Sequence, residues 1–162
     1  MEKNMMSALL EQFTLHTRLF SNVLVEISPE HATKRMNDKT NHIAWLTGSM
    51  VSIRFKLANL LGMNEQEPFP HLFKDGKAIQ NDITYPGINE LAEDWEPISK
   101  KLLEKLGNLS EKELAETSPI KLPVNDESML GALVFFADRE SYVLGQIGIL
   151  RRIFGYDAMK YN

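Results

Sequence analysis

Apolar residues recur at alternating spacings of three and four along most of the chain, which is the pattern of helices with one buried face. The first such segment covers residues 6–27 and should end before Pro29, because proline displaces the preceding residue from helical geometry. A second segment starts at Thr40 or Asn41, either of which suits an N-cap, and closes at Gly62. The pattern therefore predicts two helices in the N-terminal part of the chain.

The same spacing continues towards the C-terminus. It predicts a third helix over residues 88–107, with Pro97 as the point of a kink, and a short turn at residues 110–113 with the spacing of a capping box. A long fourth helix then follows Asn125 or Asp126 as its N-cap. No stretch alternates apolar and polar residues for long enough to predict a strand.

Residues 68–86 interrupt the helical pattern. They contain three prolines and the sequence Lys-Asp-Gly-Lys, and they show no sustained periodicity, which is typical of a long surface loop. The sequence therefore predicts an all-α fold, a four-helix bundle with this loop between the second and third helices. Its length fits a single domain over residues 1–162.

The composition narrows the classes of function. Of the 162 residues, 43% are hydrophobic and 25% are charged, as in ordinary globular proteins. No apolar run approaches the ~18 residues of a membrane-spanning helix and no signal peptide is apparent, so we expect a cytoplasmic protein that does not engage a membrane. The net charge of -4 comes without a basic patch, which argues against nucleic-acid binding. The absence of cysteine excludes a thiolate nucleophile and a sulfur-liganded metal.

Two segments carry a resemblance to a known family: residues 41–50, NHIAWLTGSM, and residues 140–152, ESYVLGQIGILRR. Both are similar to signature regions of the DinB-like superfamily, named for DNA-damage-inducible proteins, and the order of the predicted elements is similar over nearly the whole chain. The resemblance implies a four-helix bundle that holds a divalent metal with three histidines, one on the second helix and two on the last. The last two are spaced by four residues, which places them on one helix face within reach of the same ion.

This chain departs from the family at all three metal-ligand positions. Matching its Gly-Gln dipeptide to the family pattern places those positions at Ser49, Arg139 and Val143. A guanidinium has no lone pair to donate, valine has no polar atom, and a serine hydroxyl is a poor ligand for transition metals. A shifted pair, Asp138 and Tyr142, would project about 100° away from the original face. We therefore expect no metal and no other cofactor.

Several histidines and tryptophans have plain structural interpretations. His16 lies in the apolar stripe of the first helix and is expected to be a buried imidazole with a hydrogen-bond partner. His42 is expected to cap a helix or to pack at its start. The spacing of Trp45 and Trp95 predicts that both pack in the core.

The candidate ligand-binding site is a pocket at the position of the family's metal. We expect five residues to line it: Trp45, Ser49, Arg139, Val143 and Gln146. Arg139 places a permanent cation where the family holds a metal cation, and its guanidinium can bind a carboxylate or phosphate through two hydrogen bonds. The alternative is that Arg139 pairs within the protein or extends to water, and that Gln146 only connects helices.

Two hypotheses for the function follow. The first is a metal-free, non-catalytic module that binds a small anionic molecule or a protein, and that forms a homodimer through helix faces. It is favoured because all three ligand positions have changed, and a fold alone does not assign chemistry. The alternative is an enzyme, a transferase or hydrolase acting on a small thiol or a related substrate, in which Arg139 would take over the electrostatic role of the metal.

Overall fold

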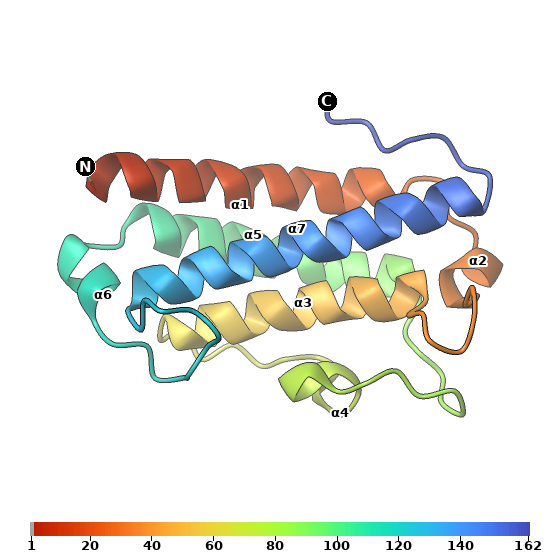
Figure 1. The fold of residues 1–162 in the computed structure, drawn as a ribbon, viewed down its shortest axis with the longest axis horizontal. Coiled ribbons are helices and arrows are strands. Elements are labelled where there is room, and N and C mark those ends of the chain that lie inside the picture. The colour runs from red at the N-terminus through yellow and green to blue at the C-terminus, as the bar shows by residue number, and fades with distance from the viewer. Residues whose placement is uncertain (1) are drawn as a thin grey trace.

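Four long helices make up most of the protein, which we describe over residues 2–162 of a computed structural model, with side chains from the fifth residue onward. They are α1 (Glu2–Leu24), α3 (Ile43–Leu60), α5 (Ile88–Gly107) and α7 (Met129–Ile153). The four lie side by side along the long axis of the molecule, and α1 and α3 each pack against both α5 and α7 (Figure 1). No strand occurs in the described residues, so the all-α prediction is confirmed.

Four short helical elements join the long ones. They are α2 (Pro29–Thr33), α4 (Pro70–Phe73), the 3-10 turn η1 (Lys74–Gly76) and α6 (Glu111–Ala115). Both α2 and α4 pack against α3, whereas α6 packs against α7 at the other end of the molecule (Figure 1). The segment 68–86 is therefore not wholly irregular, because it contains α4 and η1 and lies against the side of α3.

The end of α1 differs from the prediction. The helix stops at Leu24, and Ser28 begins the next helix instead of only ending the first. The Ser28 hydroxyl accepts a hydrogen bond from the backbone N–H of His31, at 3.2 Å. Pro29 follows as the first helical residue, where its missing N–H and fixed φ cost nothing.

The N-cap of α3 is His42, not Thr40 or Asn41. Its Nδ1 accepts a hydrogen bond from the backbone N–H of Trp45 at 3.0 Å, so the predicted capping role of His42 is confirmed. Thr40 instead closes the preceding turn, since its hydroxyl accepts hydrogen bonds from two backbone N–H groups before it. After the helix, Gly62 has a φ of 79°, the left-handed conformation expected at a helix end.

The N-cap of α7 also lies later than predicted. Ser128, rather than Asn125 or Asp126, accepts a hydrogen bond from the backbone N–H of Gly131, at 3.3 Å. Asp126 supports this cap, because its carboxylate accepts a hydrogen bond from the Ser128 N–H at 2.9 Å. Hydrogen bonding from the Ser128 side chain, and to a smaller degree from its backbone, lowers the pKa of Asp126. In both α3 and α7, several neighbouring polar residues suit the cap, and packing of the first helical turn decides among them.

The third helix and the capping box match the sequence pattern. α5 covers the predicted residues and continues through Pro97. Ser110 and Glu113 form the reciprocal bonds of a capping box, with the Ser110 N–H donating to the Glu113 carboxylate at 2.9 Å. The hydrogen bonds from Ser110, joined by one from Lys105, lower the pKa of Glu113 to about 2.

The core lies between the facing sides of the long helices. Trp95 of α5 is only 2% exposed and stacks on Phe20 of α1 with ring centroids 4.0 Å apart, as its spacing predicted. A second cluster of buried side chains, which includes Phe13, Leu102 and Leu133, fills the other half of the core. In residues 2–162 no helix combines the length and apolar character needed to cross a membrane.

Candidate functional site

A groove of about 310 Å³ lies between α3, α7 and the segment that contains α4 and η1. Its α3 wall carries Trp45, Ser49 and Lys56, and its α7 wall carries Phe135 and Arg139. These positions follow from helix geometry, because residues spaced by three, four or seven share one face of a helix. Three of the five predicted pocket residues, Trp45, Ser49 and Arg139, therefore line one groove.

The outer wall of the groove is held in place by a glycine. A Cβ atom built on Gly48 would lie 2.0 Å from the Cζ atom of Phe73, so the ring occupies the space that any side chain on Gly48 would need. Phe73 is 4% exposed and packs against Tyr85, with ring centroids 5.8 Å apart. This contact fixes the α4 segment against α3, and Phe73, Asp75 and Gly76 line the groove from that side.

The groove carries a partly buried cation that has no anionic partner among the described residues. Arg139 makes no hydrogen bond or ion pair to any of the residues described, and its guanidinium carbon lies 5.3 Å from the ring centre of Tyr142. The other two charges at the groove are Lys56 and Asp75, whose side chains are 40% and 76% exposed and whose nearest charged atoms are 3.9 Å apart. An exposed pair at that distance contributes little to stability, and Arg139 is the lining charge without an oppositely charged neighbour in the described structure.

The indole N–H of Trp45 is a second unpaired donor at this site. Its Nε1 atom is shielded from solvent and has no hydrogen-bond acceptor in the part of the chain that the structure describes. A buried donor without a partner costs about 1–3 kcal/mol.

The remaining two predicted pocket residues lie elsewhere. Val143 is 1% exposed and packs in the core with Leu144 and Ile147, and Gln146 is not among the residues that line the groove. The family's metal does not fit this set of side chains, because Ser49 and Arg139 offer only a hydroxyl and a guanidinium and Val143 offers no donor. Among the side chains of residues 5–162, no group of three or more histidine, aspartate or glutamate residues is placed to hold a metal ion.

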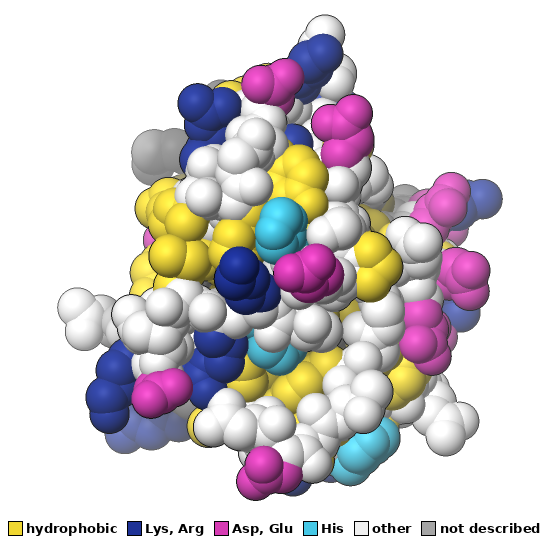
Figure 2. Space-filling view, turned by 90° about the vertical axis from the view of Figure 1, so that its right-hand side faces the viewer, with side chains coloured by type: hydrophobic (Ala, Val, Ile, Leu, Met, Phe, Trp, Pro, Cys, Tyr) yellow, Lys and Arg dark blue, Asp and Glu magenta, His cyan; other side chains and the backbone are white. Residues whose placement is uncertain are grey.

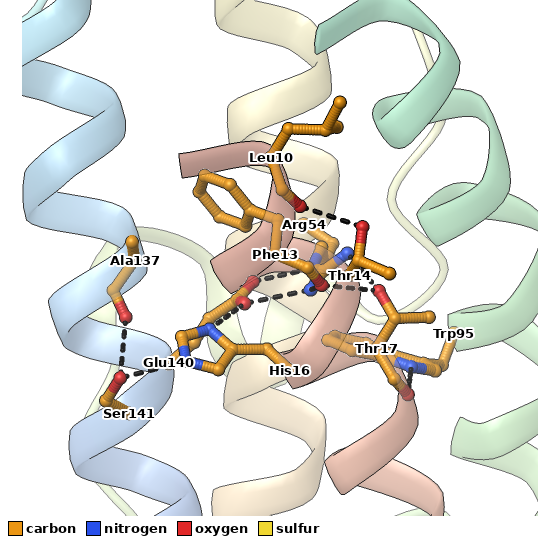
Figure 3. Close-up of polar contacts among 10 residues, drawn as sticks. All are labelled: Leu10, Phe13, Thr14, His16, Thr17, Arg54, Trp95, Ala137, Glu140 and Ser141. Atoms are coloured by element: carbon orange, nitrogen blue, oxygen red, sulfur yellow. Dashed lines mark hydrogen bonds and ion pairs between the residues drawn. The ribbon is translucent and has the colours of Figure 1, made fainter. Parts of the chain in front are cut away.

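A buried ion pair next to the groove connects three long helices (Figure 3). Arg54 of α3 and Glu140 of α7 are both fully buried, and two nitrogens of the guanidinium donate to the two carboxylate oxygens at 2.5 and 2.8 Å. Arg54 also donates to the Thr17 hydroxyl and to the carbonyl of Phe13, both on α1. Its guanidinium carbon lies 4.2 Å from the ring centre of Trp95, so aromatic carbon covers the charge.

His16 extends this cluster towards the surface. Its Nδ1 lies 3.0 Å from Glu140, and its Nε2 lies 2.9 Å from the hydroxyl of Ser141. Because a carboxylate only accepts hydrogen bonds, we assign the proton to Nδ1, which leaves Nε2 to accept from Ser141. His16 is 4% exposed and hydrogen-bonded on both sides, which confirms the prediction of a buried, satisfied imidazole.

The order serine, histidine, carboxylate resembles that of a hydrolase triad, but three features separate it from one. Glu140 is already held by both nitrogens of Arg54, and the Ser141 hydroxyl also lies 3.2 Å from the carbonyl of Ala137 in its own helix. Ser141 stands within α7, where backbone N–H groups bond to helix carbonyls and do not form an oxyanion hole. We therefore assign this cluster to the connection of α1, α3 and α7.

A second cavity, of about 440 Å³, lies at the end of the molecule where α3 begins. Figure 2 shows this end, where histidine side chains lie among hydrophobic ones. His42, Arg35 and Tyr85 contribute to the cavity. Burial, and to a smaller degree the charge of Arg35, lowers the pKa of His42 to about 4, while its own backbone contact opposes the shift. His42 is therefore neutral at physiological pH, which suits its role as an acceptor at the N-cap.

Comparison with known proteins does not assign a function to the chain. No protein-family model matches the chain, and no curated protein matches it at a significant level.

Proposed function

We propose that the chain is a DinB-like four-helix bundle that lacks the family's metal and binds a small molecule in the groove between α3 and α7. The observation that carries the proposal is that Ser49 and Arg139, two of the three positions expected to hold metal ligands, line one groove together with Trp45. The side-by-side arrangement of four long helices agrees with the bundle that the resemblance implies. A small-molecule site of about 310 Å³ is within the usual range of size.

The charges of the groove favour an anionic ligand. Arg139 is partly buried and lacks an anion among the described residues, and a guanidinium in that state gains from a carboxylate or phosphate that it can bind with two hydrogen bonds. Binding is favoured over catalysis because the one carboxylate that lines the groove, Asp75, is 76% exposed and lies near Lys56. A general base needs closer control of its position and environment than this.

A fluorescence titration tests the proposed site. We expect the anionic, apolar dye 8-anilinonaphthalene-1-sulfonate to bind the folded protein with one site per chain. Replacing Ser49 by phenylalanine should fill the groove and abolish that site, whereas Ser21→Phe, on the exposed face of α1, should leave it unchanged. Circular dichroism confirms that both variants are folded. Dye binding that survives Ser49→Phe, or that never reaches a defined stoichiometry, would contradict the proposal.

We also propose that two copies of the chain associate through the outer face of α7. Tyr142, Ile149 and Ile153 are 58%, 63% and 51% exposed and follow one another at spacings of seven and four, so they form an apolar stripe on that face. Asp138 and Arg152 lie at equal sequence distances on either side of Gly145, where a Cβ atom would meet nothing. In an antiparallel pair of α7 helices centred on that glycine, Asp138 of each copy faces Arg152 of the other.

The symmetry of this arrangement gives a charge-exchange test. Asp138→Arg and Arg152→Glu should each weaken the dimer, because each brings like charges together at two places in the interface. The variant that carries both substitutions should restore the dimer, because position 138 is then positive, position 152 is negative, and the two still attract each other across the interface. Sedimentation equilibrium measures the dimer dissociation constant of the wild-type protein, of each single variant and of the double variant. A double variant no better than the single ones, or a monomeric wild-type protein at millimolar concentration, would contradict the interface.

A further inference from the structure

The walls of the groove define the chemical class of its ligand more narrowly than its charge alone. We infer that the ligand is a monocarboxylate with an apolar body, whose carboxylate binds Arg139 and whose body lies along the aromatic side chains of α7. This inference rests on the proposed binding function. It goes further in naming the number of charges, the head group and the character of the rest of the molecule.

The charged side chains of the groove suit a ligand that carries one negative charge. Among the side chains that line the groove, Arg139 and Lys56 are positive and Asp75 is negative. Glu67 lies beside the groove, and its carboxylate accepts a hydrogen bond from the Ser52 hydroxyl at 2.5 Å. Lys56 and Asp75 already lie near each other at 3.9 Å, which leaves Arg139 as the group to be neutralised. A dianion such as a phosphate monoester would retain one uncompensated charge, and removing that charge from water is costly.

The donors at one end of the groove suit a carboxylate. The planar guanidinium of Arg139 presents two parallel N–H groups that fit the two oxygens of a carboxylate. Ser49 lines the same groove, so its hydroxyl is a second donor within it. A carboxylate has about four positions for accepting hydrogen bonds, enough for the guanidinium and for this hydroxyl.

Apolar side chains also line the groove, beside the polar Ser52, Lys56 and Asp75. Ile53 of α3, Leu122 of the segment before α7, and Phe73, Phe135 and Phe136 all contribute to its lining. Apolar surface of this kind stabilises a ligand roughly in proportion to the ligand area that it removes from water. A volume of about 310 Å³ is at the lower end of small-molecule sites, which favours a body of modest length over a long lipid chain.

Calorimetric titration with octanoate and octanamide tests the inference, because the two molecules share a chain and differ in charge. We expect octanoate to bind one site per chain and octanamide to bind at least tenfold more weakly. Arg139→Gln should weaken octanoate binding by about ten- to a hundredfold, the usual effect of removing a charged hydrogen-bond partner. Octanamide binding should not change in this variant. Arg18→Gln, at an exposed position of α1, is the matched control and should leave both affinities unchanged.

The outcomes separate the ligand class from the proposed function. If octanamide binds as tightly as octanoate, or if inorganic phosphate binds more tightly, the monocarboxylate assignment is wrong while the groove remains a binding site. If octanoate binding survives Ser49→Phe, the ligand lies elsewhere and the assignment is likewise wrong. If none of these molecules binds and the anionic dye also fails to bind, the proposed function itself is contradicted. Because Arg139 makes no hydrogen bond within the described structure, Arg139→Gln should fold normally, and circular dichroism checks this.

Discussion

Replacing Arg54 by methionine should destabilise the protein more than most single substitutions. The change removes two charged hydrogen bonds to Glu140 and two further bonds to α1, and it leaves the carboxylate fully buried with His16 as its remaining partner. Breaking a buried ion pair by removing one partner costs about 3–5 kcal/mol. For a chain of this length, that loss lowers the melting temperature by roughly 6–20 °C.

A double substitution distinguishes a buried charge from lost packing. In Arg54→Met combined with Glu140→Leu, no charge remains unpaired, and replacing a buried ion pair by apolar side chains is often close to neutral. We therefore expect the double variant to be more stable than the sum of the two single changes predicts. Lys101→Met, which breaks the exposed pair with Glu65, serves as the control and should cost at most about 1 kcal/mol.

Urea denaturation followed by circular dichroism at 222 nm measures these differences. A cost of less than about 1 kcal/mol for Arg54→Met, the range of an exposed pair, would contradict a buried pair that stabilises the fold. Additivity of the two single changes in the double variant would contradict it as well, because the pair would then contribute nothing beyond the packing of each side chain.

Three other substitutions have defined outcomes. Gly131→Ala should lower the free energy of unfolding by about 1–3 kcal/mol in urea denaturation, because its Cβ would lie 2.1 Å from the backbone oxygen of Asp126. Gly48→Ala should displace the Phe73 ring and increase proteolytic cleavage within residues 68–86, as followed by mass spectrometry. The pKa of His42 is lowered from 6.5 to about 4 in the folded protein, so the unfolded chain binds more protons in that window and stability falls as pH drops from 6.5 to 4. His42→Asn, which can still cap, should reduce this fall in thermal denaturation curves.

Helical periodicity predicted the long elements because it reports which side chains face the core. It did not predict where each helix begins, because several polar residues with similar capping ability precede α3 and α7. The pair Ser28 and Pro29 shows the same limit: proline ends one helix and also suits the first position of the next. Local preferences leave both possibilities open, and the packing of α2 on α3 selects one.

The buried ion pair could have been predicted from the sequence by looking for charged residues at buried positions of the helical pattern. Arg54 lies four residues after Met50, and Glu140 lies four residues after Phe136, so both charges occupy positions in buried stripes. Opposite charges in the buried stripes of two helices predict a pairing across the core, since a lone buried charge is too costly. His16, in the stripe of α1, belongs to the same set.

The groove was only partly predictable. Helix spacing brings Trp45 near Ser49 and directs Arg139 towards the same side, but it does not show that Val143 points into the core instead. The wall formed by Phe73 depends on the absence of a side chain at Gly48, a contact between segments far apart in sequence. Such tertiary contacts have no local signature in a single chain.

The proposed function requires that the groove lined by Ser49 and Arg139 holds no metal, and the metal content of the purified protein decides whether it does. The protein should be purified without a metal-binding tag, incubated with equimolar zinc or nickel, passed through a desalting column and analysed for metal per chain. We predict far less than one bound ion per chain, because Ser49, Arg139 and Val143 supply no suitable ligand set. One tightly bound ion per chain would contradict a metal-free groove and would favour the alternative hypothesis that the protein is an enzyme.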